Sequence, residues 1–459
     1  MARSGSPRGA VRALALILAL VCIVAGLVSG RPDTTALGAP FALLALGHRA
    51  GRRLAVDHSR PDVSITTDRR AVPGSRIRLL LAPAGPPRRD RIVATTLAAP
   101  GFRPEALVLS SDEDCPLLVD APFSGELDVL SYGSTSTLAD LSDPRPFSPA
   151  PPVRVSVLPP VGPAPDRPVS RRLVGLAGTH GSRRPGDGTE LRGVSPLQPG
   201  DQVRRIDWRA TARRSTDQDR PMVRRNYADA EASVLLVIDQ GQDLPASTAD
   251  WFAAGAPVLG AGSLHVARTA ATTIAASYLA VGDRVGLDDL AGTRRALRAA
   301  AGARQLEQIR VRLAGTPVEP RRRRRRDPVP PQGAVVLVFS PFVDDEPGRL
   351  LRLWRAQGHL VVGVDTVPPL EHTATTTAQT QAVQLTLLRR TAILAQLQQD
   401  GIPVFSGVAS DPRLATPATS RAARNGPADL TDLTDLSTGL RLMSRSARLG
   451  AARAGRRAP

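Results

Sequence analysis

Two acidic residues follow a strongly apolar segment in a position that could support chemistry. The run from Ser233 to Ile238 is continuously apolar and leads into Asp239, and Asp243 comes four residues later. Such a run is typical of a buried parallel strand, and ligands bind beyond the carboxyl ends of parallel strands. Two carboxylates there could hold a hard cation such as Mg²⁺, or could cap the following turn.

A second group, His180 with Ser182 and Asp187, contains the residue types of a hydrolase. No Gly-x-Ser-x-Gly elbow and no oxyanion-hole element accompanies these residues in the sequence. A histidine in a loop is therefore the better interpretation. We predict no catalytic residues, and we keep a hydrolase or a metal-dependent enzyme as an alternative.

The basic residues narrow the function classes further. All 60 of them are arginine, because the chain of 459 residues contains no lysine. A Walker-type phosphate loop and a Schiff-base enzyme both need a lysine, so both classes are disfavoured. We expect no cofactor, apart from the Mg²⁺ considered above. Neither a disulfide framework nor a Cys-x-x-Cys metal site is indicated by Cys22 and Cys115.

The net charge of +18 raises nucleic-acid binding as another alternative. The arginines are spread over the whole chain, and aromatic residues make up only 3% of it. Nucleic-acid binding is therefore disfavoured, since single-stranded partners need stacking residues. The run Arg321 to Arg326 is interpreted as a solvated loop, with a patch for acidic lipid or a partner as the alternative.

The elements that would position Asp239 alternate between strand and helix. Strands are predicted over 233–239, 283–287, 334–340, 359–365 and 402–405, and helices over 263–280, 305–313, 348–357 and 387–399. This alternation predicts a doubly wound parallel sheet within residues 231–410. Leucines at 430, 433, 436 and 440 have helical spacing, which suits a docking helix or a terminal core helix in residues 411–459.

Residues 54–160 have a different pattern. Short segments such as Val153 to Val157 alternate apolar and polar residues, with Pro, Gly and Asp between segments. A period of two predicts half-buried strands, and several of them suggest a small antiparallel β-sandwich-like domain that serves for spacing or protein contact. A proline-rich linker from Pro159 to Pro168 follows.

The N-terminal residues 1–53 are predicted to anchor the chain in a membrane. Uncharged apolar stretches at about 13–30 and 34–47 are candidate transmembrane helices, although the second is short for a span. Arginines flank the outer ends of the pair, at Arg3, Arg8, Arg12, Arg49, Arg52 and Arg53. The positive-inside rule then places both ends, and the soluble domains, in the cytoplasm. The alternative is a cleaved signal peptide, but no convincing cleavage site follows the first stretch.

The most distinctive segment lies in residues 161–230. A glycine-rich acidic stretch is followed by Pro-Gly-Asp and then by Arg-x-Ile-Asp-Trp. We expect Asp201 to cap a short helix, on which Asp201 and Arg205 lie four residues apart and Trp208 belongs to an apolar flank that packs. A solvated basic face is the simplest interpretation of its arginines.

This segment resembles the signature of the bacterial domain of unknown function 58 family. The matching positions are Gly186, Asp187, Gly188, Glu190, Pro199, Gly200, Asp201, Arg205, Ile206, Asp207, Trp208, Ala212 and Arg213. The resemblance implies two N-terminal membrane helices, a β-rich domain, the signature and a von Willebrand factor A-like domain. It assigns no catalytic role to the signature residues.

The resemblance also sharpens the expectations about metal and partners. A von Willebrand A-like domain would carry Asp-x-Ser-x-Ser after its first strand, but here Gly241 and Asp243 replace the two serines. Asp239, Asp243 and Ser340 are thus the candidate ligands of a degenerate Mg²⁺ site. Family members are associated with MoxR-type AAA+ ATPases. We therefore expect a multi-pass cell-membrane adaptor that binds partner proteins and lipid, and neither acts as an enzyme nor binds nucleic acid.

Overall fold

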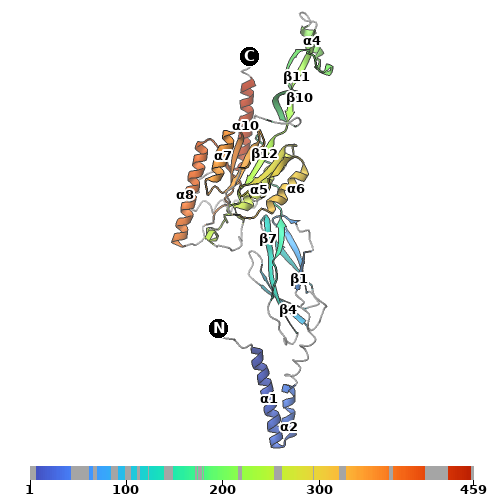
Figure 1. Cartoon of the computed structure of the whole chain (residues 1–459), viewed down its shortest axis with the longest axis vertical. Coiled ribbons are helices and arrows are strands. Elements are labelled where there is room, and N and C mark those ends of the chain that lie inside the picture. Colours follow the sequence, from blue (N-terminus) through green and yellow to red (C-terminus); the bar gives the residue numbers. More distant parts are fainter. Residues whose placement is uncertain are drawn as a thin grey trace. The chain divides into compact units, whose positions relative to one another are not determined.

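The protein divides into two compact units in the computed structural model shown in Figure 1. One comprises Met1–Asp68, Arg76–Val119 and Asp128–Arg154, and the other Arg69–Ser75, Asp120–Leu127 and Val155–Pro459. The residues described are 7–42, 61–65, 70–83, 91–98, 105–110, 114–121, 123–138, 148–170, 173, 178, 180–214, 220–252, 261–292, 294–319, 327–371, 376–408 and 433–455.

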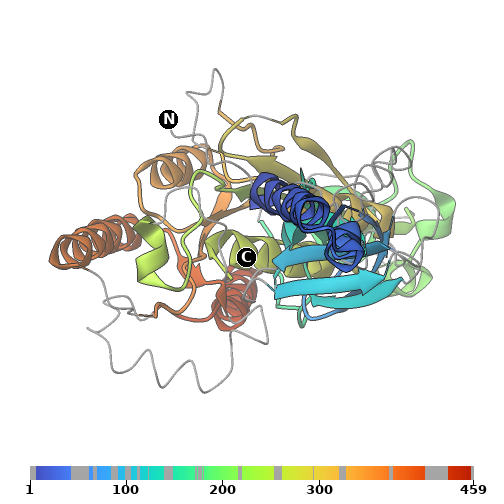
Figure 2. The ribbon, with the colours of Figure 1, turned by 90° about the horizontal axis from the view of Figure 1, so that it is seen from below.

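The N-terminal helices belong to the first unit. Helix α1 (Pro7–Ser29) is followed by α2 (Pro32–Ala36), and the two lie side by side in both ribbon views (Figures 1 and 2). Their approach is close, because a Cβ on Gly26 would lie 2.5 Å from the backbone nitrogen of Thr35. Where the structure describes the chain, no helix combines the length and the apolar character needed to cross a membrane. The two predicted transmembrane helices are therefore not confirmed.

The other described residues of the first unit form mainly strands, as the period-two pattern predicts. One sheet has the order β1-β3-β6, from β1 (Pro61–Ile65), β3 (Arg76–Pro83) and β6 (Cys115–Asp120). A second group pairs β4 (Arg91–Ala98) with both β5 (Glu105–Ser110) and β7 (Gly125–Leu138), and β7 with β8 (Ser148–Pro149). The pairings β1–β3, β4–β5, β4–β7 and β7–β8 are antiparallel.

The second unit contains a largely parallel sheet in the order β14-β13-β12-β15-β16-β17. Its strands are β12 (Ser233–Ile238), β13 (Arg284–Asp289), β14 (Leu297–Ala300), β15 (Val335–Ser340), β16 (Leu360–Asp365) and β17 (Val404–Ser406). Strand β14 is antiparallel to β13 and was not predicted. In the same unit β2 (Arg70–Ala71) pairs in parallel with β9 (Val153–Val157).

Helices cover both faces of this sheet. Alternate residues of each central strand point to opposite faces, and they enter two separate hydrophobic cores. One core joins the sheet to α5 (Ser263–Leu279), α6 (Ala303–Ala314) and α10 (Leu436–Gly455). The other joins it to α7 (Glu346–Ala356) and α8 (Thr377–Gln399). A mixed α/β domain with a parallel sheet is thus confirmed.

The signature segment forms a long hairpin in the second unit (Figure 1). Strand β10 (His180–Pro196) pairs antiparallel with β11 (Met222–Ala230), and the connection carries a 3₁₀ turn, η1 (Val203–Arg205), and helix α4 (Trp208–Arg214). A further 3₁₀ turn, η2 (Thr248–Phe252), follows β12.

The prediction for the C-terminal leucines is confirmed in part, and three other predictions fall outside the described residues. Leu436 and Leu440 of α10 are buried in the core, so the terminal core helix is correct for these two residues. Leu430, the run Arg321 to Arg326 and residues 43–47 of the second apolar stretch lie outside the described residues.

Candidate functional site at the carboxyl edge of the sheet

The connections of the sheet reverse direction between β12 and β15. From β12 the chain moves to β13 on one side, and from β15 it moves to β16 and β17 on the other. Ligands of open α/β sheets bind at the carboxyl ends of the strands at such a reversal. Asp239 follows β12 and Ser340 ends β15, so two of the three predicted metal ligands lie at this point.

Asp239 and Ser340 are hydrogen-bonded to each other. The Ser340 hydroxyl donates to Asp239 Oδ2 at 2.6 Å, and the backbone N–H of Gly241 donates to Asp239 Oδ1 at 3.1 Å. The Ser340 hydroxyl in turn accepts from the backbone N–H of Phe342 at 2.9 Å. Both side chains are almost fully buried, at 3% and 0% exposure. Buried polar groups need such partners, because an unsatisfied one is costly.

The loop after β15 is held in an uncommon conformation. Phe342 is fully buried and has a φ of 52°, the left-handed region that bulky residues rarely adopt. Its backbone is fixed by Ser340, and the preceding carbonyl of Pro341 accepts from Arg390 Nε at 3.2 Å. The same guanidinium donates to Asp365 at the end of β16. This ion pair is buried on both sides, so it ties α8 to two strand ends.

The third predicted ligand, Asp243, is hydrogen-bonded to the start of α5. Its Oδ1 accepts from the backbone N–H of Leu264 at 2.8 Å and from the Ser263 hydroxyl at 3.3 Å. A carboxylate at this place satisfies free N–H groups of the first helical turn. In the part of the chain that the structure describes, no three His, Cys, Asp or Glu side chains are grouped to hold a metal ion.

Asp243 also interacts with a buried arginine, Arg268, which no sequence motif marks. Arg268 on α5 donates to the carbonyl oxygens of Ser124 and Thr316. Burial lowers its pKa to about 10, and the charges of Asp243 and Glu126 oppose that shift. The arginine therefore remains charged at neutral pH and joins the loops of Ser124 and Thr316 to α5.

The signature residues form a set of ion pairs across the hairpin. Asp201 accepts from both terminal nitrogens of Arg225, and its Oδ2 accepts from the backbone N–H of Gln198 at 2.7 Å. The Arg225 side chain lowers the pKa of Asp201, and the Gln198 N–H adds to the effect. Arg205 pairs with Asp187 on β10. Asp201 and Arg205, which lie four residues apart in the sequence, thus have different ion-pair partners.

Asp207 begins helix α4, the role expected of Asp201. Its Oδ1 accepts from the backbone N–H groups of Arg209 at 3.1 Å and Ala210 at 3.0 Å, and its Oδ2 accepts from Arg224 Nε at 2.8 Å. The Arg224 side chain is the main cause of a lowered pKa at Asp207. Trp208 was expected to pack, but 67% of it is exposed.

The other signature positions shape the backbone or lie at the surface. A Cβ on Gly186 or Gly188 would come within 2.3 Å of an atom on β11, so both glycines permit close pairing. Gly200 has a φ of 95° in the turn after Pro199, which favours glycine. Of the remaining positions, Glu190, Ala212 and Arg213 are exposed and Ile206 is half-buried.

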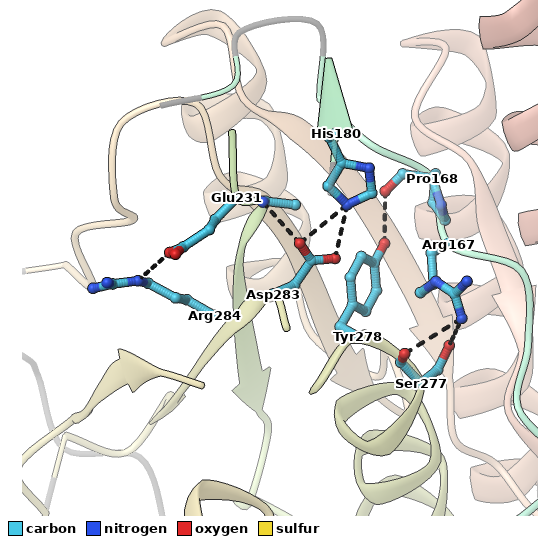
Figure 3. A network of polar contacts seen from close by, with 9 residues as sticks. Arg167, Pro168, His180, Glu231, Ser277, Tyr278, Asp283 and Arg284 are labelled. Atoms are coloured by element: carbon cyan, nitrogen blue, oxygen red, sulfur yellow. Dashed lines mark hydrogen bonds and ion pairs between the residues drawn. The ribbon is translucent and has the colours of Figure 1, made fainter. Parts of the chain in front are cut away.

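His180 is part of a structural network at the base of the hairpin (Figure 3). Its Nε2 lies 3.0 Å from Asp283 Oδ1, which also accepts from the backbone N–H of Ala232 at 2.9 Å. Tyr278 donates to the carbonyl of Pro168 at 2.6 Å, and burial raises the pKa of this tyrosine. The carboxylate beside His180 is Asp283, and the signature Asp187 is bound to Arg205. The three hydrolase candidates are therefore not brought together.

The fold and the hairpin define a mixed α/β protein with an ion-paired signature segment. Residues 194–375 match the model of the family described as "Protein of unknown function DUF58". The predicted resemblance to this family is therefore confirmed over that range.

Uncharacterized proteins of Mycobacterium bovis and Mycobacterium tuberculosis are similar over a shorter stretch. They are 42% identical over 82 residues, which is 18% of this chain and 25% of each relative. The chain thus matches a quarter of the length of these relatives. A solved structure, a marsupial T cell receptor, is 14% identical and covers 38% of this chain and 88% of its own. Its TM-score of 0.17 carries no structural argument.

Proposed function

We propose that this protein is a membrane-anchored, non-enzymatic adaptor, which binds partner proteins through loops at the carboxyl edge of its α/β sheet. The observation that carries this proposal is that the polar side chains at the strand ends bind one another. Asp239 binds Ser340, and Asp365 binds Arg390, each within a buried pair. Such pairs fix the shape of the loops above them, and preorganised loops lose less entropy on binding.

The same observation disfavours the enzyme alternatives. A general base or nucleophile must reach the substrate, but Asp239 and Ser340 are nearly inaccessible. The arrangement also does not fit Mg²⁺ well, because Asp243 is directed to α5 while Asp239 is satisfied by Ser340 and Gly241. The likeness to a von Willebrand A-like domain stays part of the proposal, supported by the strand order and the reversal at β12 and β15. No step is derived through a metal.

Membrane attachment rests on how α1 distributes its side chains. The small residues Ala15 and Ala19 are buried, whereas Leu20 and Leu27 are 63% and 71% exposed. A helix in water buries its large apolar residues, but membrane helices pack through small ones and present large ones to lipid. We propose that α1 and the segment after it form a hairpin in the cell membrane, with the soluble parts in the cytoplasm. The family resemblance supplies a candidate partner, a MoxR-type AAA+ ATPase.

Photocrosslinking from the carboxyl edge tests the adaptor role. Phe252 ends the 3₁₀ turn after β12 and is 38% exposed, so Phe252→benzoylphenylalanine is a conservative probe of this edge in the full chain. We expect a discrete protein adduct in intact membranes that weakens with Asp239→Ala and persists with Asp239→Asn. No adduct at this position, or an adduct indifferent to Asp239→Ala, would remove the carboxyl edge as the contact surface.

Proteolysis of sealed, right-side-out vesicles tests the attachment separately. We expect the bulk of the chain to survive, because it lies inside. Removal of the bulk would contradict the cytoplasmic placement, whatever the outcome of crosslinking.

A further inference from the structure

The connection between β10 and β11 exposes large apolar side chains, which proteins usually bury. Trp208 on α4 is 67% exposed and Val203 of η1 is 71% exposed. The chain has two other tryptophans, and neither resembles Trp208: Trp354 is 1% exposed, and Trp251 is half-buried with its Nε1 donating to Pro245. An exposed tryptophan on an ordered helix needs an explanation, because burial of such a ring is strongly favourable.

Trp208 is accompanied by arginines that are exposed to solvent. Arg209, Arg213 and Arg220 are exposed, and within the described residues none of them has an ion-pair partner. The nearby carboxylates of Asp201 and Asp207 are occupied by arginines of β11. Among the described residues of this connection, these three arginines therefore leave an excess of positive charge. We call Val203, Trp208, Arg209, Arg213 and Arg220 the tip surface.

The tip surface is held by contacts beneath it. Asp207 caps α4 and binds Arg224, and its backbone N–H donates to the carbonyl of Met222 at 2.7 Å. The Thr211 hydroxyl accepts from the backbone N–H of Met222 at 2.8 Å, which joins α4 to the start of β11. Trp208 and the free arginines are thus presented from a fixed support, so binding need not order the backbone first.

We infer that the tip surface docks an acidic segment of a partner protein. Trp208 would insert as the apolar anchor, and the arginines would form bidentate pairs with Asp and Glu carboxylates. Tryptophan and arginine are the residues most enriched at binding hot spots. This surface is separate from the carboxyl edge of the sheet, so the inference stands if the edge proves not to be a contact surface.

A protein partner explains the tip surface better than lipid or nucleic acid does. Interfacial membrane binding scales with buried apolar area, and the tip surface offers one tryptophan and one valine. Single-stranded nucleic acid needs a series of stacking aromatics, whereas Trp208 is the single aromatic residue of the tip surface. One rigid aromatic anchor accompanied by exposed arginines is typical of a protein hot spot.

The test uses the full chain in intact membranes with Trp208→benzoylphenylalanine. Leu388→benzoylphenylalanine is the matched control, because Leu388 is 55% exposed on α8, away from the signature segment. We expect a discrete protein adduct from position 208 whose contact peptide, identified by mass spectrometry, has a net negative charge. Joint replacement by Arg209→Glu and Arg213→Glu should lower the yield about tenfold or more. Replacing the acidic residues of the contact peptide with basic ones should restore the adduct yield of the Arg209→Glu and Arg213→Glu variant.

Three outcomes would overturn the inference. A yield no greater than at position 388 would mean that the tip surface docks nothing. A neutral or basic contact peptide would contradict the charge argument. Phospholipid adducts in place of protein, together with a blue shift of Trp208 emission on anionic phosphatidylglycerol vesicles, would assign the surface to the membrane. Failure at position 208 with success at position 252 would leave the proposed function intact.

The conservative pair Arg209→Lys and Arg213→Lys sharpens the result. Lysine keeps the charge but not the planar fork that binds carboxylates bidentately. We expect an intermediate yield, above that of the glutamate pair and below that of the natural chain. A yield equal to that of the natural chain would contradict the bidentate pairs, because positive charge alone would then be sufficient.

Discussion

The carboxyl edge of the sheet and the tip of the signature hairpin are both supported by carboxylate pairs, but they differ in burial. At the carboxyl edge, the side chains of Asp365 and Arg390 are 7% and 4% exposed. At the tip, Asp207 is 15% exposed and its partner Arg224 is 60% exposed. A pair that water cannot reach is costly to break, whereas an exposed pair is weakened by water and salt.

This difference separates stability from recognition in the molecule. The buried pairs lie at the ends of central strands, so the α/β domain depends on them. The exposed pairs fix a short helix and its tryptophan, which the domain core does not contact. Substitutions in the two regions should therefore have effects of different size and kind.

Asp365→Ala should have the largest effect, because it leaves the Arg390 charge buried without its partner. We expect the free energy of unfolding of the α/β domain to fall by about 3–5 kcal/mol in urea denaturation. Asp345→Ala, which breaks the exposed pair with Arg389, is the matched control and should cost less than about 1 kcal/mol. Similar losses for the two variants would contradict the assigned difference in burial.

Asp239→Ala should have an intermediate effect, since the Ser340 hydroxyl and the Gly241 N–H both lose their acceptor. We expect a loss of about 1–3 kcal/mol in the same denaturation measurement. Asp239→Asn keeps a side-chain oxygen beside Ser340 and should recover part of that loss. If the two variants unfold at the same denaturant concentration, the hydrogen bond to Ser340 does not stabilise the strand ends.

Acid should loosen the tip of the signature hairpin. The pKa values of Asp201 and Asp207 are lowered in the folded chain, mainly by Arg225 and Arg224. Their stabilisation is therefore complete above the ordinary aspartate pKa near 3.9 and is lost as the pH falls through the lower folded values.

Amide hydrogen exchange at Ala210, whose N–H donates to Asp207, measures this loss. We expect protection at Ala210 to fall below about pH 3.9 in the natural chain, and to be low and independent of pH in Asp207→Ala. Protection that stays constant through this pH range would show that the carboxylate does not hold the start of α4.

Trp208→Ala should have the smallest effect on stability, because the exposed ring makes few contacts. We expect the free energy of unfolding to change by less than about 0.5 kcal/mol. The matched control is Trp354→Ala in the buried core, which should cost about 3–5 kcal/mol. A loss above 1 kcal/mol for Trp208→Ala would mean that the tryptophan belongs to the fold and not to a docking surface.

Much of the α/β domain could be predicted from the sequence. Strand β12 stands out as an unbroken apolar run, and α5 follows the turn-rich segment after it. Strand β14 was missed because Leu297–Ala300 is short, contains Arg298 and pairs antiparallel at the sheet edge. Period and composition carry too little information in a segment of that length.

The candidate site was predictable only where chemistry follows local sequence. Asp239 could be found because it ends an apolar run. The pair of Asp365 and Arg390 was missed because the two residues come from separate elements, and no spacing joins them. Asp201 was assigned the wrong role for the same reason, since its partner Arg225 lies across the hairpin. Local sequence indicates that a carboxylate caps the helix. Ion pairs with residues distant in the sequence decide which carboxylate does so.

The central claim is that this chain acts by contact at defined surfaces, and radical footprinting in membranes tests it most directly. Oxidation rates of Trp208 at the tip, Phe252 at the carboxyl edge and Leu388 on α8 would be compared between intact membranes and the purified chain. The account predicts that Trp208 and Phe252 react several-fold more slowly in membranes while Leu388 is unchanged. Equal rates in the two preparations, or an equal decrease at all three positions, would contradict it.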